Sequence, residues 1–197
     1  MKCFYIALSC LMLACNAKQK NNPSATSESA KSVDAAHLIT MDGIGDIKEG
    51  ISQTDLEAIL KRKIPLTNPT DSLSGSWMDY ATVPYQNDSL YFTFVRTFTT
   101  VTDSFYMRVL AIESTNPLHR TKGNIGVGST KKEIIEAYPD KRIYIEPEYE
   151  NDSLFTTSKV FYRVFVRDDR EGPQIACYLK NGVVFKMEVS SYYDDEE

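Results

Sequence analysis

The stretch from residue 47 to residue 56, IKEGISQTDL, has a counterpart at residues 125–134, IGVGSTKKEI. In each copy a glycine comes shortly before a hydroxyl residue, Ser52 or Thr130, and an acidic residue follows three positions later. This spacing is typical of a helix N-terminus, because the two side chains cap each other's backbone amides. Each copy therefore predicts the start of a short helix with one apolar face.

A second pair of similar segments, YQNDSL at 85–90 and YENDSL at 149–154, predicts a β-hairpin turn in each half. Apolar residues then alternate with a period of two, as in antiparallel strands, and KNG at 180–182 predicts a final type I′ turn. We therefore predict an α+β fold of two tandem repeats, about 44–116 and 117–193. Each repeat is expected to be a short helix followed by an antiparallel β meander, with the helices packed on one face of the sheet.

Residues 1–15, MKCFYIALSCLMLAC, have the basic start and short apolar run of a signal peptide, and the run is too short to span a bilayer. The end of this run, LMLAC, resembles the bacterial lipobox, which implies lipidation of Cys15. Cleavage before Cys10 and an ordinary secretory signal are the alternatives. Residues 16–39 are expected to form a flexible polar tether, and residues 40–197 a single domain. We therefore expect an outer-membrane lipoprotein of the bacterial cell envelope, facing the periplasm or the cell surface.

A Gly-x-Ser/Thr helix start followed by a meander, with Asn-Gly-Val near the end, resembles the BamE-like and β-lactamase-inhibitory-protein-like lipoproteins. The resemblance covers about residues 44–193. It implies an α+β architecture that hosts envelope assembly subunits and enzyme inhibitors alike. The sequence departs from the family at the helix ends, where Ile64-Pro65 and Tyr138-Pro139 stand in place of Leu-Gly-x-Pro.

The composition excludes several classes of protein. With 22 Lys and Arg against 27 Asp and Glu, the net charge is -5, which excludes a basic nucleic-acid-binding protein. Cys177 lies in an alternating apolar stretch and is expected to be a buried small hydrophobe. Two histidines, without C-x-x-C or H-x-x-x-H spacing, indicate neither a metal site nor another cofactor. Residues 123–130 resemble a phosphate-binding loop, but Ser129 replaces its lysine, so no nucleotide is expected.

The remaining candidates concern catalysis and binding. Carboxylates such as Glu146 and Asp168 would serve a hydrolase of glycans or peptides only if a pair came within ~5 to 10 Å. We instead expect a non-catalytic module that binds another envelope protein, with the hydrolase and capture of a small apolar ligand between helices and sheet as alternatives. Tyr and Arg are enriched at binding hot spots. The partner surface is therefore predicted on the sheet face opposite the apolar positions, at Tyr91, Tyr106, Arg108, Arg163, Tyr178 and Lys186.

Overall fold

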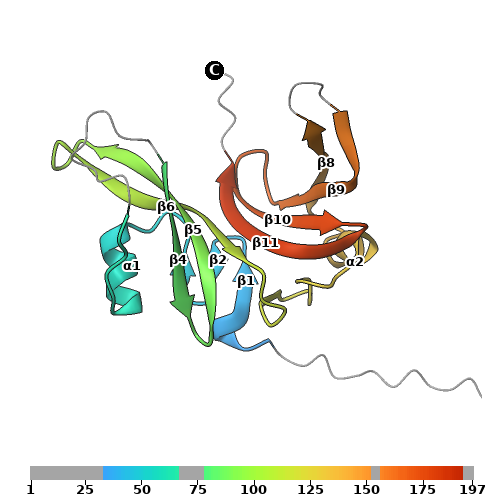
Figure 1. Ribbon diagram of the computed structural model, residues 1–197, viewed down its shortest axis with the longest axis horizontal. Coiled ribbons are helices and arrows are strands. Elements are labelled where there is room, and N and C mark those ends of the chain that lie inside the picture. The colour runs from blue at the N-terminus through green and yellow to red at the C-terminus, as the bar shows by residue number, and fades with distance from the viewer. Residues whose placement is uncertain (1–32, 67–77, 152–155, 193–197) are drawn as a thin grey trace, which may run out of the picture. The chain divides into compact units, whose positions relative to one another are not determined.

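The computed structural model describes residues 33–66, 78–151 and 156–192, and these residues are mostly in β-strands (Figure 1). In chain order the elements are η1 (Ala35–His37), β1 (Leu38–Thr40), β2 (Gly43–Ile44), β3 (Ile47–Lys48), α1 (Gln53–Leu60), β4 (Met78–Tyr85), β5 (Asp88–Thr99), β6 (Ser104–Ser114), β7 (Arg120–Thr121), α2 (Lys131–Ala137), β8 (Arg142–Asn151), β9 (Thr156–Arg167), β10 (Gly172–Lys180) and β11 (Val183–Tyr192). The strands form one sheet of seven and one sheet of four.

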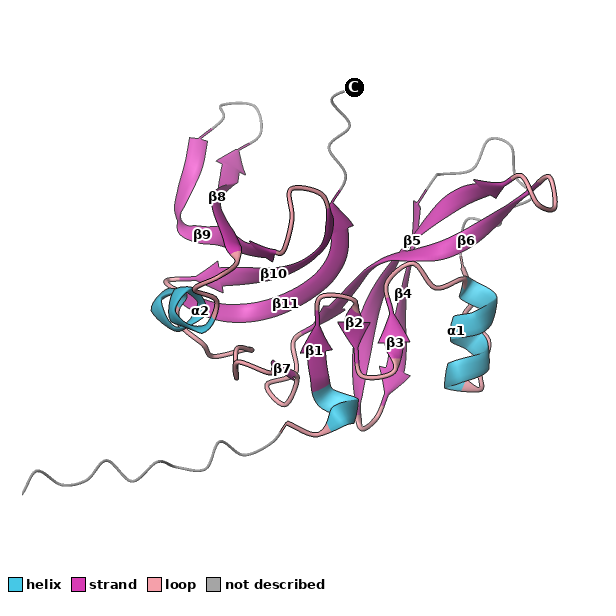
Figure 2. Ribbon diagram, turned by 180° about the vertical axis from the view of Figure 1, so that it is seen from behind, coloured by secondary structure: helices cyan, strands magenta, loops and turns pink. Residues whose placement is uncertain are grey.

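The larger sheet has the order β4-β5-β6-β11-β10-β9-β8, and each neighbouring pair is antiparallel. Strands β4–β6 come from the first half of the chain and β8–β11 from the second. The two groups join where Val189 of β11 pairs with Ile112 of β6. Figure 2 shows β10 and β11 curving between β4–β6 and the β8–β9 hairpin. One sheet therefore runs through both halves of the sequence.

The smaller sheet, of order β3-β2-β1-β7, contributes to the same core as the larger one. Its Ile39, Ile44 and Ile47 belong to one buried cluster with the apolar positions of the larger sheet. Those positions include Phe92, Phe94, Val109, Ile112, Val164, Val166, Ile175, Cys177, Met187 and Val189. Successive side chains of a strand point to opposite faces. The larger sheet therefore has a core face, which carries these residues, and an opposite face, called the outer face below.

The two helices begin where the sequence predicts. Ser52 caps α1 by accepting a hydrogen bond from the Asp55 amide at 3.1 Å. Thr130 and Glu133 form a complete capping box on α2. The caps satisfy amides that the first turn of a helix leaves without partners.

The predicted fold class is wrong, because the helices do not form a layer on the sheet. They are eight and seven residues long, and each has a single buried residue, Leu56 in α1 and Ile134 in α2. Much of the apolar surface that packs on the core face comes instead from the four-stranded sheet. The molecule is a mostly-β fold of two sheets rather than an α+β tandem repeat.

Two of the predicted hairpin turns are confirmed. Tyr85 pairs with Asp88 across the first turn. In the last turn, Asn181 and Gly182 have φ values of 52° and 83°, the positive values that a type I′ turn requires. Strands β8 and β9 pair antiparallel, but the turn at 152–155 lies outside the described residues. Cys15, Cys10 and the predicted tether up to residue 32 also lie outside them.

Candidate functional site

The six residues predicted to contact a partner all lie on the outer face, but the structure brings only three of them together. Tyr178 of β10 stands between Arg163 of β9 and Lys186 of β11, as direct cross-strand neighbours. The other three lie on β5 and β6, beyond β11 in the sheet: Tyr91, Tyr106 and Arg108. The predicted surface therefore divides into a cluster around Tyr91 and one around Tyr178, which meet at Glu113. Tyr106 and Arg108 lie further along β6.

The first cluster is centred on Tyr91. Its ring stacks on that of Tyr80 in β4, with centroids 6.0 Å apart and an interplanar angle of 18°. Tyr80 is 52% exposed and Tyr91 37% exposed. Burial, followed by the charge of Glu113, raises the pKa of Tyr91, so its hydroxyl remains neutral at physiological pH. The pair presents two aromatic rings to solvent, a feature typical of interface hot spots.

Arg108, which lies further along β6 opposite Val95, has a structural role. Its Nε donates a hydrogen bond to Thr97 Oγ1 at 3.0 Å, and its Nη1 lies 3.4 Å from Glu49 Oε1. The chain around Glu49 also pairs with β6, because the Gly50 amide donates to the Val109 carbonyl at 2.9 Å. Arg108 therefore fastens this segment to the sheet, and its guanidinium is already engaged.

The second cluster is a polar network that joins the two halves of the chain. Lys186 Nζ donates to Glu113 Oε2 at 2.9 Å and lies 3.9 Å from the centre of the Tyr178 ring. The Tyr178 hydroxyl donates to Glu188 Oε2 at 2.6 Å. Glu113 and Glu188 stand directly opposite each other on β6 and β11. Like charges in this position repel, so the Lys186 and Tyr178 contacts stabilise the join.

The same environment keeps Tyr178 in its neutral form. Burial, followed by the negative charge of Glu188, raises the pKa of Tyr178 far above its ordinary value. A neutral phenol donates a hydrogen bond, whereas a phenolate next to a carboxylate would repel it. Tyr178 is therefore a hydrogen-bond donor in this network and not a base.

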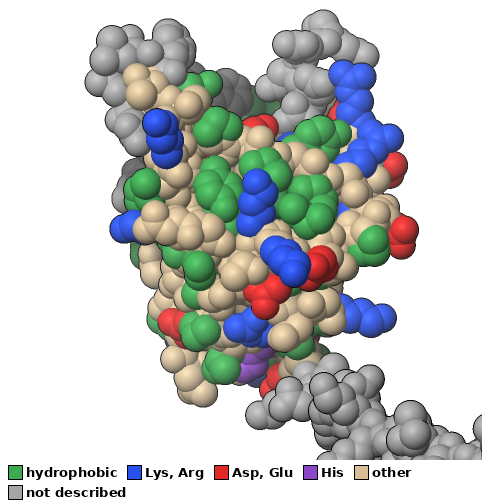
Figure 3. Space-filling model, turned by 90° about the vertical axis from the view of Figure 1, so that its right-hand side faces the viewer, with side chains coloured by type: hydrophobic (Ala, Val, Ile, Leu, Met, Phe, Trp, Pro, Cys, Tyr) green, Lys and Arg blue, Asp and Glu red, His purple; other side chains and the backbone are tan. Residues whose placement is uncertain are grey.

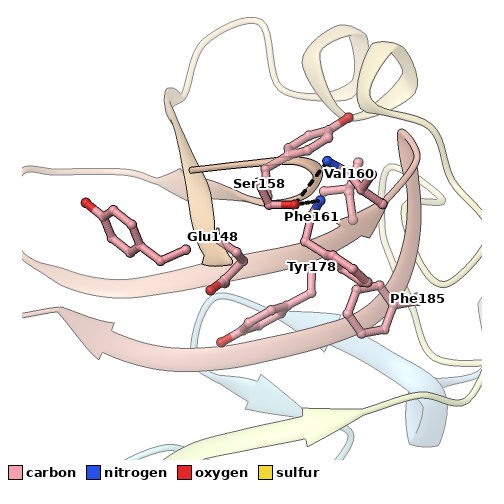
Figure 4. Close-up of a pocket in the computed structure, with 9 residues that line it drawn as sticks. Glu148, Ser158, Val160, Phe161, Tyr178 and Phe185 are labelled. Atoms are coloured by element: carbon pink, nitrogen blue, oxygen red, sulfur yellow. Dashed lines mark hydrogen bonds between the residues drawn. The ribbon is translucent and has the colours of Figure 1, made fainter. Parts of the chain in front are cut away.

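A pocket of about 690 Å³ opens beside Tyr178, between the β8–β9 hairpin and strands β10 and β11 (Figure 4). Much of its lining is aromatic. Phe185 lies edge-on to Phe161 and to Tyr178, with ring centroids 6.2 Å and 6.4 Å away. Tyr149 and Tyr162 complete the aromatic lining. Pockets of roughly 300–1,000 Å³ with such walls are typical of small-molecule sites.

Besides the tyrosines, the polar side chains that line this pocket are Ser158 and Glu148, and both have partners. The Ser158 hydroxyl accepts hydrogen bonds from the amides of Val160 and Phe161, each at 3.1 Å (Figure 4). Glu148 Oε1 lies 2.8 Å from Arg163 Nε. The pocket thus offers apolar contact with little unsatisfied polarity.

The structure gives no support to the carboxylates predicted for a hydrolase. Glu146, on β8, lies 3.7 Å from Arg163 Nη2, and Asp168, after β9, pairs with Lys141. Their side chains are 51% and 53% exposed. Each belongs to its own ion pair. Across 33–66, 78–151 and 156–192, no three His, Cys, Asp or Glu side chains cluster to hold a metal ion.

Two further sequence candidates have structural roles. Cys177 is completely buried, as predicted, and burial raises the pKa of its thiol to about 12. In the glycine-rich segment 123–130, the loop is tied to the Arg120 guanidinium, which donates to the carbonyls of Asn124 and Val127 at 2.9 Å and 3.1 Å. This cation is occupied by backbone oxygens and not presented to a phosphate.

His119 is a buried polar residue that the sequence gives no means of predicting. It is 1% exposed, and its Nδ1 lies 2.5 Å from Ser114 Oγ. Its ring is 5.3 Å from that of His37, and its Nε2 has no hydrogen-bond partner among the residues described. Burial, followed by the proximity of His37, lowers the pKa of His119 to about 4. The imidazole is therefore neutral at physiological pH.

Comparisons with known proteins add nothing to this description. No protein-family model, curated protein or solved structure matches the chain. The resemblance to BamE-like lipoproteins therefore remains a prediction. In the described part of the chain, no helix has the length and apolar character needed to cross a membrane.

Several residues of the site escaped sequence reasoning. Glu188 shares the polar side of β11 with Lys186, which predicts its place on the outer face but not its hydrogen bond with Tyr178. No such signal identifies Glu113 as the partner of Lys186, because they are 73 positions apart. Likewise, nothing in the sequence brings Phe185 against Phe161.

Proposed function

We propose that this chain is a lipid-anchored protein of the bacterial cell envelope that binds another envelope protein through the outer face of its larger sheet, without catalysis. The lipobox-like LMLAC ending at Cys15 supports the location. The observation that carries the binding role is the exposed, stacked pair of Tyr80 and Tyr91. Tyrosine gives a large contact area with little loss of side-chain freedom, which favours its use in binding surfaces.

The state of the carboxylates favours binding over hydrolysis. Glu113 is held by Lys186, and Glu188 by the hydroxyls of Tyr178 and Ser190, at 2.6–2.9 Å. A catalytic carboxyl group has to come within hydrogen-bond reach of its substrate. These two carboxyl groups are instead engaged by side chains of the protein itself.

The experiment is affinity purification of the protein from living cells after crosslinking, with Tyr80→Ala and Tyr91→Ala combined. Interface hot spots each contribute about 2 kcal/mol or more to binding. We therefore expect the double variant to lose at least tenfold of the co-purified partner. Both residues are partly exposed, so we expect the variant to remain folded.

The matched control replaces exposed apolar residues on the helices, Ile59→Ala and Ile135→Ala, each 43% exposed in the parent protein. We expect this control to retain the partner. A Cys15→Ala variant, which cannot be lipidated, is expected to lose both membrane attachment and the partner. Equal recovery of the partner with the tyrosine and helix variants would exclude the outer face as the binding surface.

A further inference from the structure

The pocket beside Tyr178 has a charge pattern that points to a class of ligand. Its carboxylate, Glu148, is 2.8 Å from Arg163. A cationic ligand would have to displace Arg163 from Glu148 and leave the guanidinium with only the longer contact to Glu146, at 3.7 Å. Losing the closer partner is costly where the ion is partly buried. The side chain of Arg163 is only 33% exposed. The pocket is therefore poorly suited to a cation.

A lysine next to the pocket is in the opposite condition. Lys180 pairs with Phe161 across β10 and β9, and its Nζ lies 5.2 Å from the centre of the Phe161 ring, which lines the pocket. This ammonium has no carboxylate partner among the described residues. Figure 3 shows the side of the molecule on the right of Figure 1, where basic side chains stand among hydrophobic ones.

We propose that this pocket binds a small amphiphilic anion, an alkyl or aryl group that carries one carboxylate. The apolar group lies against Phe161 and Phe185, and the carboxylate is held by the Lys180 ammonium. The ammonium already lies over an aromatic face, so the anion adds a counter-ion without displacing an existing ion pair. This role goes beyond the proposed partner binding and requires no second protein.

The test measures binding of decanoate to the purified Cys15→Ala chain by calorimetry in the absence of detergent. Decyltrimethylammonium and decanol serve as probes of the same chain length with positive and no charge. We expect saturable one-to-one binding of decanoate, at least tenfold tighter than that of either other probe. Tighter binding of the cation, or no saturable binding of decanoate, would overturn the proposal.

Variants test which residues are responsible. We expect Lys180→Gln to weaken decanoate binding about tenfold and to leave decanol binding unchanged. Phe185→Ala, at a ring that is 42% exposed in the parent protein, is expected to weaken the binding of both. The control is Lys132→Gln, because that lysine pairs with Glu136 on the exposed side of α2. If Lys180→Gln and Phe185→Ala both bind decanoate as tightly as the parent protein, the pocket is excluded as the binding site.

Two further measurements distinguish the pocket from a lipid-binding surface and from the partner-binding face. One contrary outcome is that the protein binds anionic phospholipid vesicles in a way that depends on Lys180 and yet does not bind free decanoate. That result would show a lipid surface as the target and contradict the proposal. The Tyr80→Ala and Tyr91→Ala variant is expected to bind decanoate normally. Loss of the partner protein alone would therefore leave this inference standing, and loss of decanoate binding alone would leave the proposed function standing.

Discussion

Acidification is expected to destabilise the protein through His119. The folded state holds the pKa of His119 at about 4, below the ordinary value of 6.5, because burial disfavours the charged ring and His37 lies 5.3 Å away. Between these two values the unfolded chain binds a proton that the folded chain does not. The free energy of unfolding therefore falls as the pH falls through this window, and is fully retained above pH 6.5.

The size of the effect follows from the same shift. One pKa unit corresponds to about 1.4 kcal/mol, so His119 is expected to cost about 2 kcal/mol at pH 5 and about 3 kcal/mol at pH 4. The groups that face it are His37, Tyr85, Ser114 and, with the opposite effect on its pKa, Asp88. His37 is the other imidazole in contact with His119, so it needs its own control.

The assay is urea unfolding followed by far-ultraviolet circular dichroism at pH 7, 5 and 4. The parent protein is compared with His119→Gln, which keeps a polar group near Ser114 but cannot titrate, and with His37→Gln. We expect the parent to lose about 2 kcal/mol more than His119→Gln between pH 7 and pH 5. A difference below about 0.5 kcal/mol would refute the reasoning, because a shift of that size has to appear as a proton linkage.

Three further predictions concern local features and are tested by urea unfolding. Thr130→Ala removes the capping box of α2 and should cost about 1 kcal/mol; an unchanged unfolding midpoint would contradict the cap. Leu56→Ala, at the buried residue of α1, should lower the free energy of unfolding by about 2–5 kcal/mol. Ile59→Ala, at a residue that is 43% exposed, should lower it far less. Equal losses in the two variants would contradict this packing of α1. Gly45→Ala should lower the free energy of unfolding by more than about 2 kcal/mol. The reason is that φ of Gly45 is +58° and the new Cβ would lie 2.6 Å from the Ala36 carbonyl oxygen. An unchanged free energy of unfolding would contradict this close approach.

The parts of the fold that depend on local sequence were predictable. Ser52 and Thr130 mark the helix starts because each cap forms with a residue three positions away. The turn at Asn181 and Gly182 was predictable for the same reason, since few residues adopt the positive φ of a type I′ turn. These features need no knowledge of the rest of the chain.

The fold class was not predictable, because it depends on long-range pairing. Strands β1, β2, β3 and β7 are two or three residues long, too short to show a period of two. The helix pattern, in contrast, is strong in sequence although each helix buries only one residue. The sequence pattern therefore predicts that the helices cover the larger sheet, whereas the four-stranded sheet supplies much of that layer.

The candidate site was predictable as a face but not as a set of contacts. Alternation along the strands places Tyr91, Tyr178 and Lys186 opposite the core. The join of β6 to β11, which sets Glu113 across from Glu188, depends on tertiary structure. The same is true of Arg108, whose partner Glu49 is 59 positions away and leaves the arginine with a structural role.

Site-specific photocrosslinking in living cells tests the proposed binding role most directly. A photoreactive residue replaces Tyr80 in one strain and Ile59 in another, both in the otherwise unchanged protein. We predict a discrete adduct with one envelope protein from position 80, absent from position 59 and lost when Cys15 is replaced by Ala. No adduct from position 80, or the same adduct from position 59, would contradict a partner on the outer face.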